Sequence, residues 1–114
     1  MKISADDIKA VNQQLNEDKY PWVDEALLES ALPSYSYYRS SLEQACSIFR
    51  GLVKNRAFSN ANKRTACVVL IDLLRQARLK EPGSEDLIGL VLDVAEHQYE
   101  VEEIASKLKK LIYN

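Results

Sequence analysis

The chain has 114 residues, of which 46% are hydrophobic and 28% charged, and its formal net charge at pH 7 is −2. These values are ordinary for a soluble globular protein and predict a single domain over residues 1–114, long enough to bury a core without disulfides or metal ions. The slightly negative charge argues against direct nucleic-acid binding, which usually needs a basic surplus.

Several features predict a cytoplasmic protein with no membrane contact. The longest apolar run, Ala66 to Ile71, is far shorter than the roughly 18 residues that a membrane span needs. The N-terminus, Met1 to Asp7, has no apolar core and is not a signal peptide. Cys46 and Cys67 lie in apolar helical stretches and form no C-x-x-C pair, so we expect small buried thiols in a reducing compartment.

Three glycines and three prolines leave few breaks, and no alternating strand pattern is present, so the chain is predicted to be all-α. Ser4, with Asp7 three residues on, resembles a capping box at the start of the first helix. A polar loop is expected over residues 16–22. A short helix is expected from about residue 24 to residue 32, where Pro33 stops it.

The stretch from Ser34 to Ser40 has the one β-like composition in the chain, because it contains Tyr35, Tyr37 and Tyr38. It predicts either a short extended flap or a loop, and its tyrosines either face a partner or pack over the helical core. Ser41 is predicted to cap the next helix, which runs to about residue 55.

The following helix begins at Asn60 or Ala61 and runs to about residue 79. Its residues 66, 68–71, 73 and 74 are apolar and lie nearly all round the helix, which predicts a helix buried on most sides at the centre of the fold. Glu81-Pro82-Gly83 ends this region. Ser84 is expected to cap a fifth helix, and a last helix is expected to begin at residue 100.

The residues from 56 to 65, Arg-Ala-Phe-Ser-Asn-Ala-Asn-Lys-Arg-Thr, place polar and cationic side chains where a loop enters the central helix. Unpaired N–H groups and the helix dipole favour an anion at such a start. Lys63 and Arg64 add positive charge, and Asn62 can orient the loop or donate to an oxygen. Phe58 can anchor the loop by burial. These residues predict a phosphate or anion site; a solvated basic patch is the alternative.

The block Phe58-x-Asn60-Ala61-Asn62-Lys63-Arg64 resembles the signature loop of the Fic/Doc superfamily, in the form found in its Doc ("death on curing") branch. That motif reads His-x-Phe-x-Asp/Asn-Ala/Gly-Asn-Lys/Gly-Arg. The similarity extends to Ile3–Ile8, to the helices on both sides of the loop, and to the closing segment Val101–Leu108. It implies a Fic/Doc-like helical bundle around a central buried helix.

The resemblance implies a chemistry and a set of partners. In the family a motif histidine acts as general base for a protein hydroxyl that attacks ATP, whose Mg²⁺ is held by the acidic loop residue. Fic enzymes transfer AMP, whereas Doc transfers the γ-phosphate to elongation factor Tu. Ala61, Asn62, Lys63 and Arg64 would bind the phosphates, and Tyr35, Tyr37 and Tyr38 would lie in a flap that pairs with the target. A Phd-like antitoxin chain is the implied partner.

Two positions depart from the motif. Arg56 stands in the place of the histidine, and arginine stays protonated and cannot act as a base. Losing a positioned base costs roughly 10²–10⁴ in rate. Asn60 stands where Doc has an acid, so any Mg²⁺ ligation there is weakened. Arg56 is then either a further phosphate ligand or a solvated cation. It is either natural or a replacement that made a toxic protein expressible.

Two functions from different classes follow. The first is a Doc-like toxin of a toxin–antitoxin module, impaired by the loss of its base. The second is a non-catalytic Fic-fold interaction or nucleotide-binding module. The single histidine, His97, lies outside the loop and is expected at the surface rather than in the role of the missing base. The family's inhibitory motif ends in Glu-Gly/Asn, and no glutamate here precedes Gly or Asn, so inhibition within the chain is not expected.

Overall fold

A computed structural model describes residues 2–113 and shows an all-α fold. Six α-helices and one short 3-10 helix follow one another in these residues: α1 (Ala5–Leu15), α2 (Glu25–Ser30), η1 (Pro33–Tyr37), α3 (Ser41–Asn55), α4 (Asn62–Gln76), α5 (Ser84–Glu96) and α6 (Val101–Ile112). No helix in the described part of the chain is both long and apolar enough to span a bilayer.

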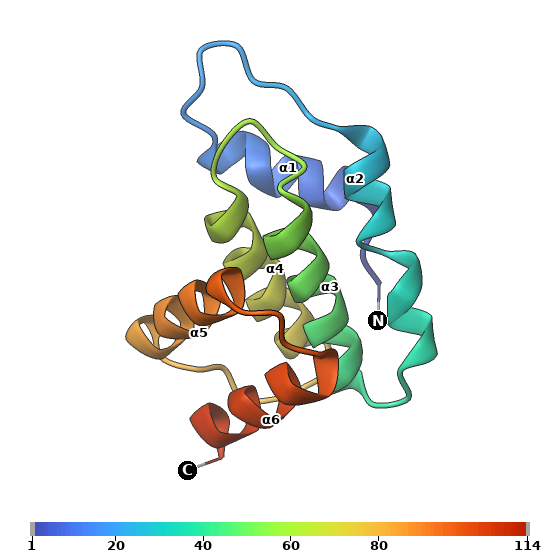
Figure 1. Cartoon of the computed structure of the whole chain (residues 1–114), viewed down its shortest axis with the longest axis vertical. Helices are drawn as coiled ribbons and strands as arrows, with labels where there is room; N and C mark the ends of the chain where they lie inside the picture. The colour runs from blue at the N-terminus through green and yellow to red at the C-terminus, as the bar shows by residue number, and fades with distance from the viewer. Residues whose placement is uncertain (1, 114) are drawn as a thin grey trace.

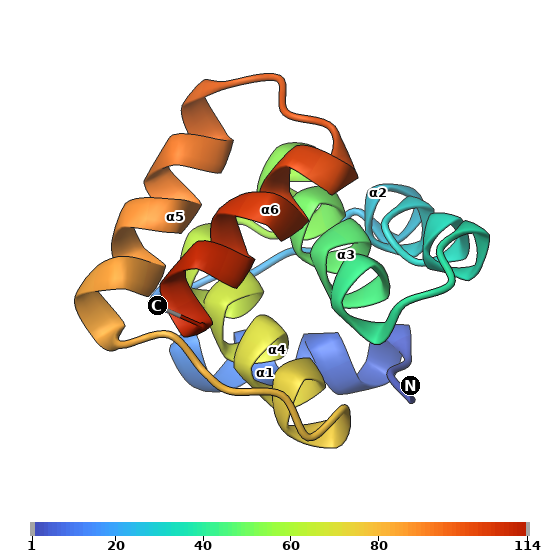
Figure 2. The ribbon, with the colours of Figure 1, turned by 90° about the horizontal axis from the view of Figure 1, so that it is seen from below.

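The helices α3 and α4 form the centre of the molecule and pack along each other (Figure 1). In the view of Figure 2, α1 lies against α4 on one side of this pair, and α6 lies against α3 on the other. The segment of α2 and η1 packs on α3, and α5 packs on both central helices. The loop between α3 and α4 is therefore held at one end of the bundle by its two best-packed helices.

The predicted start of α1 is confirmed. The hydroxyl of Ser4 accepts a hydrogen bond from the Asp7 N–H at 3.1 Å, and the Asp7 carboxylate accepts one from the Ser4 N–H at 2.9 Å. Two other predicted caps are displaced by one residue. Ser40, not Ser41, caps α3, and α5 begins after Gly83 without a side-chain cap.

The helix α4 is shorter and less enclosed than its sequence suggests. It ends at Gln76 because Arg78 adopts a left-handed conformation (φ 58°), and its backbone then closes a Schellman turn through Leu79 N–H and the Leu74 carbonyl at 2.9 Å. Residues 65, 66, 69, 70, 73 and 74 are buried, but Val68 is 44% exposed. The prediction of a central helix is confirmed, although one side of it reaches the surface.

The tyrosine stretch is not extended. Pro33 fixes its own φ and is the first residue of the 3-10 helix Pro33–Tyr37. The sequence predicted either an extended flap or a loop here, and the structure has a short helix instead. Tyr35 and Tyr38 are partly buried against the core, whereas Tyr37 is exposed. Packing over the helices, one of the two roles considered for these tyrosines, describes Tyr35 and Tyr38.

Both cysteines are free thiols. Cys46 is fully buried in α3, and burial raises the pKa of its thiol to about 12. Cys67 is partly buried in α4, and burial raises its pKa to about 11. Because the thiolate is the reactive form, neither residue is suited to nucleophilic chemistry at neutral pH, in keeping with the packing role expected of them.

Two glycines provide a matched test of the packing. A Cβ at Gly51 would lie 2.7 Å from the Cβ of Ala31, whereas one at Gly89 would meet no atom within 4 Å. We expect Gly51→Ala to lower the free energy of unfolding by about 1–3 kcal/mol through overpacking between α2 and α3. Gly89→Ala should raise it by about 1 kcal/mol, because alanine favours a helix. Urea unfolding measures both; an unchanged stability of Gly51→Ala would contradict the close approach of α2 and α3.

Candidate functional site

The loop between α3 and α4 is closed by the side chain of Asn62. Its Oδ1 accepts a hydrogen bond from the Phe58 N–H at 3.0 Å, and its Nδ2 donates to the Phe58 carbonyl at 2.9 Å. The oxygen and the nitrogen of the side-chain amide therefore both hydrogen-bond to the backbone of Phe58. Of the two roles that the sequence left open for Asn62, its side chain performs the first, orienting the loop.

The chain on either side of this closure bends through left-handed backbone. Arg56 (φ 51°, ψ 52°) ends α3, and Ala61 (φ 61°, ψ 24°) precedes α4. This conformation is unfavourable for residues with a Cβ, by roughly 1–2 kcal/mol. The Asn62 bonds, together with the burial of Phe58 (5% exposed), hold the loop in this shape. The anchoring role predicted for Phe58 agrees with its burial.

A buried asparagine of α1 supports the loop from behind. Asn12 is 4% exposed, and its Nδ2 donates to the Asn60 carbonyl and to the Thr65 hydroxyl, both at 3.0 Å. Its Oδ1 accepts from Asn16 Nδ2 at 3.0 Å, and Asn16 Nδ2 also reaches Ser59 Oγ at 3.2 Å. Asn12 therefore ties α1 to both the loop and the first turn of α4.

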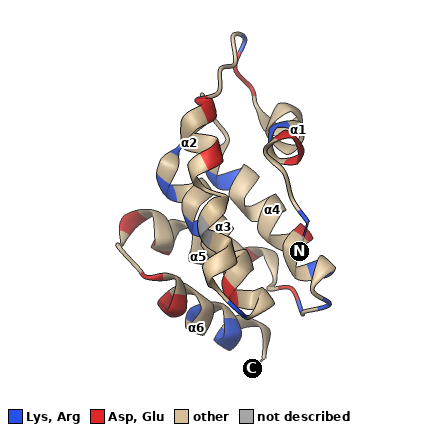
Figure 3. Ribbon diagram, turned by 90° about the vertical axis from the view of Figure 1, so that its right-hand side faces the viewer, with Lys and Arg blue, Asp and Glu red and all other residues tan. Residues whose placement is uncertain are grey.

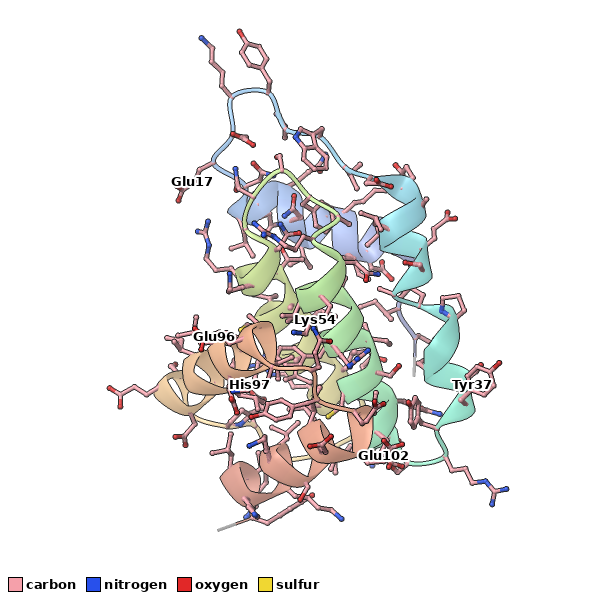
Figure 4. The ribbon with its side chains drawn as sticks, in the orientation of Figure 1. Glu17, Tyr37, Lys54, Glu96, His97 and Glu102 are labelled. Carbon is pink, nitrogen blue, oxygen red and sulfur yellow. The ribbon has the colours of Figure 1, made fainter. Side chains whose placement is uncertain are left out.

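The segment after α1 runs beside the loop. Val23 and Phe58 form an antiparallel bridge; the Asp24 N–H donates to the Ala57 carbonyl at 2.7 Å and the Ser59 N–H to the Trp22 carbonyl at 3.1 Å. The sequence predicted that a different segment, the one with Tyr35, Tyr37 and Tyr38, would form a flap beside the site. Those residues lie by the start of α3, a helix length of roughly 22 Å from the loop at its end. Figure 4 shows Glu17 at the upper left of the molecule and Tyr37 at its right-hand side.

The first turn of α4 has an unusual charge. The other five α-helices of the described chain each have an acid in the first turn, but α4 has none and carries Lys63 and Arg64 there. Figure 3 shows this cationic stretch where α4 meets the loop. No side chain caps α4, so the N–H groups of residues 62–64 have no partner among the described residues. The positive end of the helix dipole is reinforced rather than neutralised.

These groups surround a shallow depression of about 200 Å³, lined by Arg56, Ala61, Asn62, Lys63 and Arg64. The structure thus brings together all of the predicted phosphate-binding positions and the position of the family histidine. Lys63 makes no ion pair within the described residues. Arg64 has one exposed contact, with Glu17 at 3.5 Å, and such surface pairs are weak. The arrangement is suited to hold an anion.

The residues around the depression are poorly suited to hold a metal ion. Asn60, the one predicted metal ligand, directs its Oδ1 to the Glu17 N–H at 3.2 Å. Residues 2–113 contain no group of three or more His, Cys, Asp or Glu side chains placed to share a cation. The side chain of Asn60 instead fastens the loop to the α1–α2 connection.

His97 belongs to a different cluster. It is exposed at the end of α5, where its Nδ1 lies 2.9 Å from the Asp93 carbonyl and 3.0 Å from Asp93 Oδ1, and its ring stacks on Tyr99. The hydrogen bond from Tyr99 and the nearby Lys107 lower the pKa of Asp93. His97 thus braces the turn before α6 and, as expected, lies at the surface.

No protein-family model matches this chain, and no curated protein matches it. Sequence reasoning missed three residues that build the loop, Asn12, Asn16 and Ser59. Asn12 lies four residues after Ile8, on the apolar face of α1, and that position is a sequence signal of burial; its partners have no such signal.

The closure of the loop can be tested through Asn62. We expect Asn62→Ala to lower the free energy of unfolding by about 1–3 kcal/mol, because it leaves the partly buried N–H and carbonyl of Phe58 without partners. The exposed neighbour offers a control, since Lys63→Ala removes a cation from a helix N-terminus and should raise the free energy of unfolding by about 0.3–1 kcal/mol. Equal effects of the two substitutions in urea unfolding would show that Asn62 does not hold the loop.

Proposed function

We propose that this chain is a Doc-like Fic-fold protein whose α3–α4 loop binds the phosphates of ATP. The observation that carries the proposal is the depression at the uncapped start of α4, rimmed by Arg56, Lys63 and Arg64. Unpaired N–H groups at a helix start bind phosphate oxygens, and guanidinium groups bind them in bidentate fashion. The resemblance of residues 58–64 to the Doc loop supports the choice of a nucleotide as ligand.

In the proposed complex the backbone and the side chains have separate tasks. The N–H groups of residues 62–64 point to the phosphate oxygens, and Asn62 holds them in place through Phe58. Lys63 and Arg64 neutralise phosphate charge, and the binding of an anion would offset the cost of two cations at a helix N-terminus, about 0.3–1 kcal/mol each. Residues 2–113 provide no full set of metal ligands, so we assign no step to Mg²⁺, which in the family accompanies ATP.

The chemistry expected of a Doc toxin, phosphate or AMP transfer to a protein hydroxyl of a target such as elongation factor Tu, needs a proton acceptor. The depression is lined by no carboxylate or imidazole, and Arg56 cannot accept a proton. We therefore expect the chain, with Arg56 in place, to bind nucleotide without efficient transfer; the second candidate is a Fic-fold module that has no catalytic role. Under the first candidate, a Doc-like toxin of a toxin–antitoxin module, a Phd-like antitoxin is the proposed partner.

Calorimetry with ATP and Mg²⁺ tests the phosphate site. We expect saturable binding, and we expect Arg64→Ala to weaken the affinity roughly 10- to 100-fold, because a charge-assisted hydrogen bond contributes about 1.5–3 kcal/mol. Arg39→Ala is the control, since it removes the same charge before the start of α3, away from the loop. Absence of binding, or equal affinities for the two variants, would refute the site.

Substitution of Arg56 tests whether a single lost base disables the enzyme. Arg56 occupies a left-handed conformation, which histidine adopts more readily than most residues, so Arg56→His should preserve the loop. We expect it to raise transfer of label from γ- or α-labelled ATP to elongation factor Tu by about 10²–10⁴, and to arrest growth on expression. If neither transfer nor growth arrest appears while ATP still binds, the chain is a binding module.

A further inference from the structure

The outer face of α5 has features that the proposed function does not use. This helix forms one edge of the molecule in Figure 2. A helix that covers a core on one side needs an apolar stripe on that side only. In α5, Leu90, Val91 and Val94 supply the buried stripe, yet Ile88 and Leu92 are also apolar and are 56% and 47% exposed.

Gly89 is an independent observation on the same face. It lies between these two residues, in the middle of a helix, and a Cβ there would meet nothing within 4 Å. Its φ is not positive, so no backbone constraint calls for glycine. A glycine in a helix interior costs about 1 kcal/mol relative to alanine, and the isolated chain gains nothing in return. Where two helices pack, a glycine allows their backbones to come closer.

The charges of α5 indicate what kind of surface would fit. The helix carries no Lys or Arg, and its exposed Glu85 and Glu96 lie on the same side as Ile88, Gly89 and Leu92, one toward each end. Neither glutamate makes an ion pair within the described residues. Along α5 the face is therefore an apolar centre flanked by acids. Lys107 and Lys110 of α6 border it beside Gly89, and Lys107 is paired with Asp93 at 3.4 Å.

We propose that this face of α5 docks a helical segment of another protein, with an apolar ridge flanked by Lys or Arg. Such a ridge would pack on Ile88 and Leu92 across the gap left by Gly89, and its cations would pair with Glu85 and Glu96. A second copy of this chain does not fit, because pairing two α5 helices in antiparallel order would bring Glu85 of one copy close to Glu96 of the other. The proposal is independent of nucleotide binding.

The probe is a fluorescein-labelled amphipathic helical peptide with a leucine ridge flanked by lysines, titrated with the full chain and followed by anisotropy. We expect one-to-one binding that weakens with added salt. The double substitution Ile88→Ser and Leu92→Ser should weaken it at least tenfold. Leu27→Ser on α2, where the leucine is 39% exposed, is the matched control and should have no effect.

Two further results decide the proposal. Gly89→Leu should weaken peptide binding by filling the gap while leaving the chain folded, as unfolding curves would show. The same peptide with glutamates in place of its lysines should not bind. The proposal is overturned if neither peptide binds, if both bind equally, or if the serine pair changes nothing. It is also overturned if sedimentation shows a dimer that the serine pair dissociates, since the occupant is then a second copy.

Discussion

The pair of hydrogen bonds between the Asn62 amide and the backbone of Phe58 is the constraint on which the loop depends. It fixes the chain between two left-handed positions, Arg56 and Ala61, that would otherwise favour other conformations. The N-cap position before α4 is Ala61, whose side chain has no hydrogen-bond acceptor, so the first N–H groups of α4 have no partner among the described residues. Asn12 secures the same loop from α1, so two separate helices resist its collapse.

The charge of the site follows from this geometry. Where most helices of the chain place an acid, α4 places Lys63 and Arg64, and the left-handed end of α3 adds Arg56 to the same depression. Three cations at the positive end of a helix are unfavourable without an anion. The site is therefore suited to hold an anion, and under the proposed function Arg56 replaces the base, which arginine cannot supply. The outer face of α5 lies apart from this loop, and the docking role that we propose for it involves a protein partner rather than a nucleotide.

Local signals in the sequence predicted the all-α fold, because capping and apolar periodicity act within a few residues. The Ser4–Asp7 capping box and the central position of α4 are examples. The prediction of an extended tyrosine stretch was wrong because it followed composition alone, whereas Pro33 and packing on α3 favour a 3-10 helix. The sequence placed the cationic residues of the loop, but it could not reveal Asn12, whose partners Asn60 and Thr65 lie 48 and 53 residues away. Nor could it show that the side chains of Asn60 and Asn62 accept hydrogen bonds from the backbone and so hold the loop.

The most direct test of the account is a ¹H–¹⁵N correlation spectrum of the chain titrated with ATP. If phosphates sit at the start of α4, the amide signals of Asn62, Lys63 and Arg64 should shift most and saturate together, because their N–H groups have no other partner among residues 2–113. The amides of α5 and α6 should stay in place. Shifts that are absent, or that spread evenly over exposed lysines and arginines, would contradict a built phosphate site at this loop.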